Sequence, residues 1–451
     1  METSILQYIS LRRDVANKLC FGIFFAFFLF GCTDMQTPTD RSLAQRRDAR
    51  PVTPTNYSGF SLVEARDLLE QCIELNNADD RIDFPDDAYY RPTWRAKWDK
   101  VFDSRDPTSS NPNNDPTIPQ PDENGFGPYK NAWLLFESKE RPGTYAIAIR
   151  GTIGQAKSII DDLLATTIAA HSAIEIPKGR YLPITFAATA GAEAHTGFAY
   201  AAVSLLFDRR RGILSKLASL PPNSQLLITG HSQGAAVATL IHAFLYYAMS
   251  EPQDRYKLNA KNFSLKSYVF AQPKPGNAKF AIDFARIAAD KGLAFVINNS
   301  LDPVPQVPLT RQITSEVLAD TVLENQSRVR GFPALLVDGL ACAQSLVFAI
   351  RNIFSQSVEK QVTMMHSKEY KSELNLDYFK DAVFGIPSKA YSLNYVTSGN
   401  LIALFGYPKG LDSAGTNIYA FKSKKPDWLL QHHATSYREL LKRIDQSDLK
   451  I

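Results

Sequence analysis

The chain has 451 residues, a formal net charge of +4, and 45% hydrophobic and 21% charged residues. These proportions are ordinary for a globular protein, and the length suits one large domain with insertions or two domains. The small positive charge, the absence of a basic block and the absence of a phosphate-binding glycine loop argue against nucleic-acid binding.

The N-terminus has the pattern of an export signal. Arg12, Arg13 and Lys18 precede an apolar run at 19–31, which is too short to span a bilayer comfortably. The run ends in Leu-Phe-Gly before Cys32, and this ending resembles a bacterial lipoprotein signal. That resemblance implies removal of the signal, lipidation of Cys32 and a membrane-anchored protein outside the cytoplasm. The alternatives are an ordinary signal peptide, with a secreted or periplasmic protein, and an uncleaved anchor.

Residues 32–58 are polar and rich in proline and arginine, and they predict a flexible tether ahead of one domain over 59–451. Helical spacing of apolar residues predicts a first helix over 60–74. The domain contains two cysteines, Cys72 and Cys342. They form a disulfide or remain two buried free thiols, and the sequence leaves both alternatives open.

The rest of the domain alternates between predicted strands and helices. Strands are predicted at 131–136, 144–149, 225–229, 265–270 and 294–298. Helices are predicted to begin near His195, after Gly234, and over 278–289, with a last one from Ala434. Because the strands are apolar throughout, this order predicts an α/β fold in which helices cover both faces of a mostly parallel sheet.

Ser232 is at the centre of the most informative motif. Gly230-His231-Ser232-Gln233-Gly234 follows a predicted strand and opens a helix rich in small residues. A sharp turn between strand and helix exposes a serine hydroxyl at the end of a sheet, and flanking glycines let the backbones pack closely. Ser232 is therefore predicted to be a nucleophile. The alternative is a glycine-rich turn that holds an inert serine.

A serine nucleophile needs a base, and the base needs an orienting acid. Asp302 follows a strand after the nucleophile, and the prolines at 303 and 305 make its loop rigid. The alternative is a capping or turn aspartate. The histidines beyond it are His366, in a predicted insertion, and the neighbours His432 and His433, which precede the last predicted helix. Only one of these two neighbours can face the serine.

An oxyanion that forms during acyl transfer needs hydrogen-bond donors. The backbone N–H of Gln233 is one predicted donor, and Thr152, just past an early strand, is the other. The alternative for Arg150-Gly151-Thr152 is a simple turn at the end of a strand. This chemistry needs no metal or cofactor, and no Cys/His spacing in the chain resembles a metal site.

Several short motifs occur in the order found in the class 3 (fungal-type) lipases, a family of α/β-hydrolases. They are Arg150-Gly151-Thr152 with Asp161-Asp162-Leu163 downstream, His195-Thr196-Gly197-Phe198, and the segments 229–235, 270–277 and 302–305. The stretch from about Trp133 to Pro308 therefore resembles this family. The spacing from His432 to Tyr437 resembles the family's C-terminal end.

The resemblance implies an α/β-hydrolase fold and a cofactor-free hydrolysis of carboxylic esters of lipids. It implies Ser232 as nucleophile and Asp302 as acid, and it favours His432 over its neighbour as base. Thr152 and Gln233 are implied to form the oxyanion hole. A phospholipase or an acyltransferase would use the same triad. An alternative of another class is a non-catalytic surface lipoprotein that binds lipid or a partner.

Two further segments near the predicted site are candidates for covering it. The stretch of roughly 310–389, between acid and base, is longer than the family usually has and is interpreted as a helical insertion. Its apolar run at 332–354 favours cap helices over an acyl pocket, with membrane insertion as the alternative. Residues 153–164 are amphipathic and stand where the family holds a lid helix. The alternative there is a permanently packed helix.

Overall fold

The computed structural model describes residues 57–77, 93–106, 131–151, 167–176, 180–208, 211–306, 389–390, 395–419 and 430–445. All of them lie in one of the two units into which the chain divides, the unit made of 54–310 and 350–451. Several predicted features lie outside the described residues: the signal with Cys32, most of the tether, Thr152, the segment 153–164, Cys342, His366, and the predicted insertion 310–389 except its last residue.

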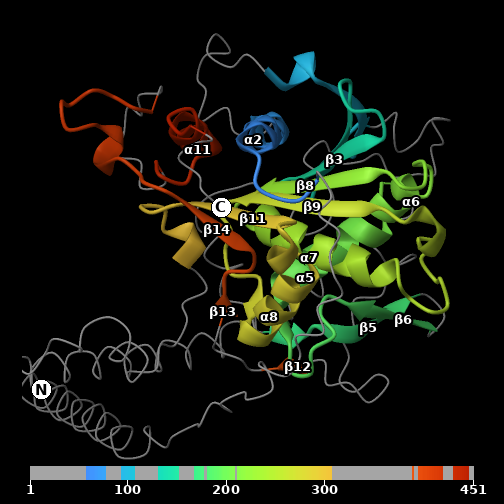
Figure 1. Cartoon of the computed structure of the whole chain (residues 1–451). Helices are drawn as coiled ribbons and strands as arrows, with labels where there is room; N and C mark the ends of the chain where they lie inside the picture. The colour runs from blue at the N-terminus through green and yellow to red at the C-terminus, as the bar shows by residue number, and fades with distance from the viewer. Residues whose placement is uncertain are drawn as a thin grey trace, which may run out of the picture. The chain divides into compact units, whose positions relative to one another are not determined.

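A seven-stranded sheet is the centre of the described structure (Figure 1), in the order β1-β2-β3-β8-β9-β11-β14. The strands from β3 to β14 run parallel, and β1 and β2 add an antiparallel edge. The predicted α/β fold with a mostly parallel sheet is therefore confirmed. The bounds are β1 Trp98–Asp103, β2 Trp133–Ser138, β3 Thr144–Ile149, β8 Gln225–His231, β9 Ser264–Phe270, β11 Ala294–Asn299 and β14 Asn400–Leu404.

The central strands are apolar throughout because both of their faces are covered. All six residues of β3 are buried, and so are all but the first residue of β8. Within β3, Ile147 belongs to one hydrophobic cluster, whereas Ala146 and Ala148 belong to the other. Successive side chains of a strand point to opposite faces, so each strand contributes to two cores.

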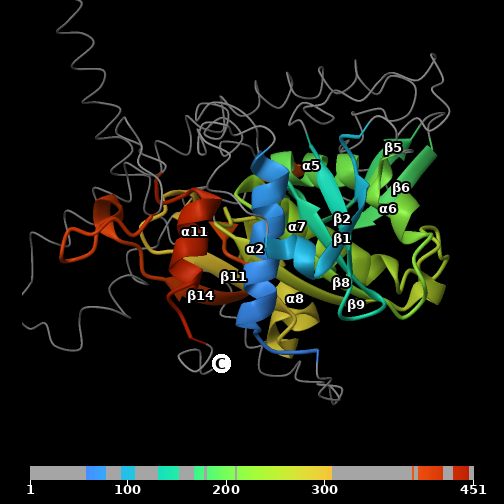
Figure 2. The same ribbon diagram turned by 90° about the horizontal axis from the view of Figure 1, so that it is seen from above.

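Helices cover the sheet on both faces (Figure 1). One face carries α2 and α11, which lie side by side in Figure 2. The other face carries α5, α7 and α8. None of the described helices is long and apolar enough to cross a membrane. The bounds are α2 Leu62–Asn77, α5 Thr196–Phe207, α6 Ile213–Leu217, α7 Gln233–Ala248, α8 Ala278–Ile287 and α11 Ala434–Leu441.

Smaller elements surround the sheet. A second sheet of very short strands has the order β12-β4-β7-β10-β13, and β5 pairs with β6 in a hairpin. The strands are β4 Thr167–Ala169, β5 His171–Ile176, β6 Arg180–Thr185, β7 Glu193–His195, β10 Gly276–Asn277, β12 Lys389–Ala390 and β13 Tyr395–Val396. The 3-10 helices are η1 Thr93–Ala96, η2 Asn259–Lys261, η3 Ala289–Lys291, η4 Val304–Gln306 and η5 Pro408–Gly410.

Within the described residues, the predicted strands and helices have the right type, and their ends differ by a few residues. The helix predicted over 60–74 is α2, and the one predicted over 278–289 ends at Ile287 and is followed by η3. Strand β14 was not predicted. Tyr57, assigned to the end of the flexible tether, is instead buried, and its hydroxyl donates to the carbonyl oxygen of Leu226.

Cys72 is a buried free thiol on α2, with its Sγ 3.4 Å from Oγ1 of Thr229. Burial raises the pKa of this thiol to about 12, so the group stays neutral and unreactive at ordinary pH. Its predicted disulfide alternative is not observed here, and Cys342 lies outside the described residues.

A buried ionic cluster joins α2 to the sheet. Glu64 of α2 accepts hydrogen bonds from Nζ of Lys266 (2.9 Å) and the hydroxyl of Tyr268 (2.8 Å), and it also pairs with Arg141. Burial alone would raise the pKa of Glu64, but the charge of Lys266 and these hydrogen bonds outweigh it and lower the pKa. The carboxylate is therefore charged in the folded protein and depends on its partners.

Removing one partner from this buried cluster is expected to destabilise the protein. Lys266→Met should lower the free energy of unfolding by roughly 3 kcal/mol, because it leaves the carboxylate of Glu64 undercompensated. Urea denaturation measures this change. The matched control is Lys139→Met, which removes a 3.1 Å pair with Asp99 whose side chains are 41% and 65% exposed. That change should cost less than about 1 kcal/mol. Equal losses in both variants would contradict the expectation.

A second prediction concerns acid stability. His242 on α7 is buried, its Nδ1 lies 2.9 Å from Oγ of Ser267, and burial lowers its pKa to about 3. The unfolded state therefore binds an extra proton between about pH 6.5 and pH 3, and stability falls as the pH falls through this window. His242→Gln should flatten the dependence by about 1.4 kcal/mol per pH unit in unfolding measurements between pH 6 and pH 4. An unchanged slope would refute the assignment.

Candidate active site

Ser232 sits in a strained turn between β8 and α7. Its φ is 59° and its ψ is −132°, a backbone conformation that non-glycine residues rarely adopt. Two backbone hydrogen bonds hold the turn: the N–H of Ser232 donates to the carbonyl of Phe270 (3.0 Å), and the N–H of Ala235 donates to the carbonyl of Ser232 (2.9 Å). The strain therefore persists because the neighbouring strand and helix determine the turn.

The glycines of the motif are required by close backbone contacts. A Cβ on Gly230 would lie 2.2 Å from the carbonyl oxygen of Gly234, and a Cβ on Gly234 would lie 2.3 Å from that of Ile149. Both approaches involve backbone atoms, which cannot move aside as a flexible side chain can. This explains in physical terms why glycine flanks the serine on both sides.

Three predicted site residues meet at the carboxyl end of the sheet. Nε2 of His432 lies 2.8 Å from Oγ of Ser232, and Nδ1 of the same ring lies 2.9 Å from Oδ2 of Asp302. All three residues are buried, with 7% or less of their surface exposed. An imidazole that carries its proton on Nδ1 donates to the carboxylate and accepts from the serine hydroxyl, so one tautomer satisfies both contacts.

The carboxylate of Asp302 has donors besides the histidine. The hydroxyl of Tyr437 donates to Oδ2 (2.7 Å), and the backbone N–H of Val304 donates to Oδ1 (2.9 Å). The same tyrosine oxygen accepts from the backbone N–H of Asn299 (3.0 Å). Tyr437 thus links the acid, the end of β11 and helix α11. The sequence indicates only the spacing of Tyr437 from His432, and nothing in it predicts the contact with Asp302.

His231, the residue before the serine, packs against the base. Its ring centroid is 4.8 Å from that of His432 and 5.7 Å from that of Tyr437. Burial, with the neighbouring histidines, lowers the pKa of His231 well below its usual value, although a hydrogen bond to the His432 backbone opposes this shift. His231 is therefore neutral and adds no positive charge beside the base.

A hydrogen-bonded glutamine precedes the base. Nε2 of Gln431 donates to the carbonyl of Tyr407 (2.7 Å), and its Oε1 accepts from the hydroxyl of Tyr419 (2.6 Å). Nδ2 of Asn299 donates to both Oε1 and the backbone oxygen of Gln431, at 2.9 Å each. We call these residues the Gln431 network. It joins the loop that carries His432 to the ends of β11 and β14, and the sequence analysis did not identify it.

The second histidine of the pair is elsewhere. His433 occupies the N-cap position of α11 and is half-buried, and its side chain makes no capping hydrogen bond. The structure therefore brings His432 to Ser232, as the resemblance favoured, and it leaves His433 at the start of the helix.

One predicted oxyanion donor is described. Gln233 is the first residue of α7, and backbone N–H groups in the first turn of a helix point toward its positive end. Gly151, at the end of β3, passes beside the turn: a Cβ on it would lie 2.9 Å from the carbonyl oxygen of His231 and 3.8 Å from the nitrogen of Gln233. Thr152, the other predicted donor, follows it directly but lies outside the described residues.

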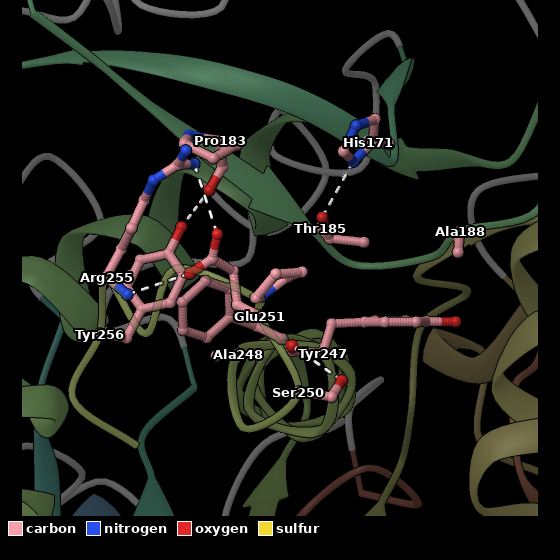
Figure 3. Close-up of a pocket in the computed structure, with 12 residues that line it drawn as sticks. His171, Pro183, Thr185, Ala188, Tyr247, Ala248, Ser250, Glu251, Arg255 and Tyr256 are labelled. Carbon is pink, nitrogen blue, oxygen red and sulfur yellow. Dashed lines mark hydrogen bonds and ion pairs between the residues drawn. The ribbon is translucent and has the colours of Figure 1, made fainter. Parts of the chain in front are cut away.

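A cavity of about 440 Å³ lies away from this site, between the β5–β6 hairpin and the end of α7 (Figure 3). Its polar side chains pair with one another: Nδ1 of His171 lies 2.9 Å from Oγ1 of Thr185, and Arg255 lies 3.5 Å from Glu251. None of the three clustered site residues lines this cavity.

Comparison with known proteins gives a partial match. Residues 146–312 match the family model described as Lipase (class 3). The secreted mono- and diacylglycerol lipase A of Penicillium cyclopium is 34% identical over 97 residues, which are 21% of this chain and 26% of that relative. The secreted mono- and diacylglycerol lipase 1 of Fusarium solani is 29% identical over 119 residues, 26% of this chain and 31% of the relative. The chain thus spans only about a quarter to a third of the length of these relatives.

The solved structures that match this chain have lower sequence identity. The M37 lipase is 17% identical, with a TM-score of 0.39, and the match covers 85% of this chain and 90% of that one. The triacylglyceride lipase of Rhizomucor miehei is 17% identical, with a TM-score of 0.33, and the match covers 55% of this chain and 73% of that one. The family match includes Ser232 and Asp302 and ends before His432. Together with the fungal relatives, this match shows that residues 146–312 are similar in sequence to the class 3 lipases.

Proposed function

We propose that this chain is a serine hydrolase that cleaves the carboxylic ester bonds of lipids. Ser232 is the nucleophile, His432 the base and Asp302 the acid. The observation that carries the proposal is the pair of contacts made by the His432 ring, at 2.8 Å to the serine oxygen and 2.9 Å to the carboxylate. The match of residues 146–312 to a lipase family supports it.

The proposed reaction proceeds in two acyl-transfer steps. Oγ of Ser232 attacks the ester carbonyl carbon while Nε2 of His432 takes the hydroxyl proton. The resulting oxyanion accepts hydrogen bonds from the N–H of Gln233 and from Thr152. Collapse of this intermediate transfers the proton to the leaving alcohol and leaves an acyl-serine. Water then attacks the acyl group with the same base, and the fatty acid and the free serine are released.

The role proposed for Asp302 follows from its surroundings. A buried carboxylate is stable only when donors satisfy it, and here the donors are His432, Tyr437 and the N–H of Val304. These bonds hold the carboxylate toward Nδ1, which fixes the proton on that nitrogen. Nε2 is then left to accept the serine proton, and the carboxylate stabilises the imidazolium that forms.

The substrate class proposed is a glycerol ester of fatty acids, because the relatives are named mono- and diacylglycerol lipases. A phospholipase or acyltransferase with the same triad would differ in its products. The three assembled residues favour catalysis over a surface lipoprotein that only binds lipid. Export is also proposed, from the signal pattern at 1–31 and the secreted relatives. Lipidation of Cys32, the lid at 153–164 and the cap insertion at 310–389 stay predictions.

The first test compares the two neighbouring histidines. Ser232→Ala and His432→Ala should each lower kcat for p-nitrophenyl butyrate by about 10⁴-fold or more, because each removes a member of one catalytic unit. His433→Ala is the matched control and should retain activity within about threefold, since its side chain makes no capping bond. Activity in Ser232→Ala, or greater loss in His433→Ala than in His432→Ala, would overturn the assignment. The ratio of palmitate to butyrate hydrolysis then separates a lipase from an esterase.

The hydroxyl of Tyr437 provides a second test. Tyr437→Phe removes a hydrogen bond to the charged acid and leaves the N–H of Asn299 without its acceptor. We expect kcat to fall about tenfold with KM little changed, since a hydrogen bond to a charged group contributes roughly 1.5–3 kcal/mol. Tyr145→Phe is the control, because it removes a tyrosine hydroxyl that bonds to Glu137 (3.1 Å) and not to the acid or the Gln431 network. Equal kcat in the parent and Tyr437→Phe would show that the tyrosine does not position Asp302.

A further inference from the structure

The last strand of the sheet exposes an apolar row. Along β14 the side chains alternate: Ile402 and Leu404 are buried in the core beneath α11, while Leu401, Ala403 and the following Phe405 face outward. Leu401 is 59% exposed and Phe405 is 80% exposed. Phe405 is the most exposed of the large apolar side chains that the structure describes. A row of exposed apolar side chains on one side of a strand marks a candidate interaction surface.

This row ends beside the acid. The carbonyl of Leu404 accepts from the N–H of Ser300 (2.8 Å), and the N–H of Gly406 donates to Oγ of the same serine (3.2 Å). The next residue after that serine is Leu301, which is 42% exposed and directly precedes Asp302. We call Leu301, Leu401, Ala403 and Phe405 the edge surface. It therefore adjoins the carboxyl end of the sheet, where the candidate triad lies.

The edge surface is also fixed relative to the base. The Gln431 network binds the carbonyl of Tyr407, two residues beyond Phe405, directly to the residue that precedes His432. The hydroxyl of Tyr419 reinforces this joint, because it accepts from the N–H of Tyr407 (3.2 Å). A partner that engages Phe405 would thus be held at a defined position with respect to the serine–histidine pair.

We propose that the edge surface docks on the lipid phase that contains the ester substrate. The inference rests on the proposed function and adds the surface by which the site approaches its insoluble substrate. A lipid phase fits because it accepts apolar side chains without shape complementarity and supplies the substrate at the same place. The flanking loop suits the polar boundary of such a phase, since Tyr407 is half-buried and Lys409 is exposed.

The chain offers a matched control on the opposite edge of the sheet. Val101 lies on β1, is 47% exposed, and stands at the other end of the strand order from β14. Replacing it by serine removes a comparable exposed apolar side chain that is not next to the candidate triad. Both variants replace an exposed apolar side chain by serine, and only Phe405 lies next to the candidate triad.

The test compares, in the full chain, hydrolysis of emulsified diacylglycerol with that of soluble p-nitrophenyl butyrate. Phe405→Ser should lower the ratio of the two rates about tenfold, because the transfer of one aromatic side chain into lipid is lost. Val101→Ser should leave the ratio unchanged. An unchanged ratio in Phe405→Ser, or equal falls in both variants, would overturn the proposal.

A second readout does not need catalysis. In the Ser232→Ala background, Phe405→Trp should shift its added tryptophan emission to the blue on mixing with phosphatidylcholine vesicles that contain diacylglycerol, whereas Val101→Trp should not. This measurement separates failure of the proposed function from failure of the docking proposal. If the parent chain has no esterase activity but the emission still shifts, the proposed function is rejected and the docking proposal is retained. The absence of a shift would reject docking on lipid. Self-association of the chain that Phe405→Ser abolishes would show that a second copy, and not lipid, covers this surface.

Discussion

The buried carboxylate of Asp302 is the constraint on which the arrangement of the site depends. A carboxylate removed from water is tolerated only when hydrogen-bond donors replace its hydration. Its donors come from separate parts of the chain: the ring of His432, the hydroxyl of Tyr437 and the backbone of its own loop. Satisfying one charge therefore requires the end of β11 and the start of α11 to meet.

The position of α11 is in turn stabilised by α2, which lies more than 350 residues earlier in the chain. Arg66 of α2 donates to the carbonyl oxygens of Leu441 and Ile444, at 2.8 Å each, where α11 ends. Carbonyls at the end of a helix lack the regular helical partners, and a cation near a helix C-terminus is also favoured by the helix dipole. The cluster of Glu64 with Lys266 ties α2 to the sheet. A continuous set of polar contacts thus extends from the sheet through α2 and α11 to the base.

The strained turn at Ser232 has the complementary role. Its conformation is costly by about 1–3 kcal/mol, and the cost is borne by the buried strands and helix around it. Close contacts at Gly230 and Gly234 leave no room for side chains, so the strand, the turn and the helix pack tightly on both sides of the serine. In the proposed reaction, a turn held in this way would keep the hydroxyl oriented before substrate binds and so reduce the reorganisation required.

The sequence by itself determined the features that are local. The strand, turn and helix around Ser232, the strand before Asp302 and the start of α11 at Ala434 follow from short-range periodicity, glycine spacing and proline placement, and each is present in the structure. Strand β14 was missed because five residues with only partial alternation are a weak signal. The strands of the second sheet, two or three residues long, carry no periodicity at all.

Only the tertiary structure shows that His432 rather than His433 contacts Ser232, because adjacent residues in a loop have the same local pattern and differ only in direction. It also identified Tyr437 and the Gln431 network, whose partners lie more than a hundred residues away in the chain. Such contacts depend on how α11, β11 and β14 pack, and no short window of sequence contains that information. The candidate site residues were thus predicted from motifs, whereas the contact of one histidine with the serine and the residues that support it depend on packing.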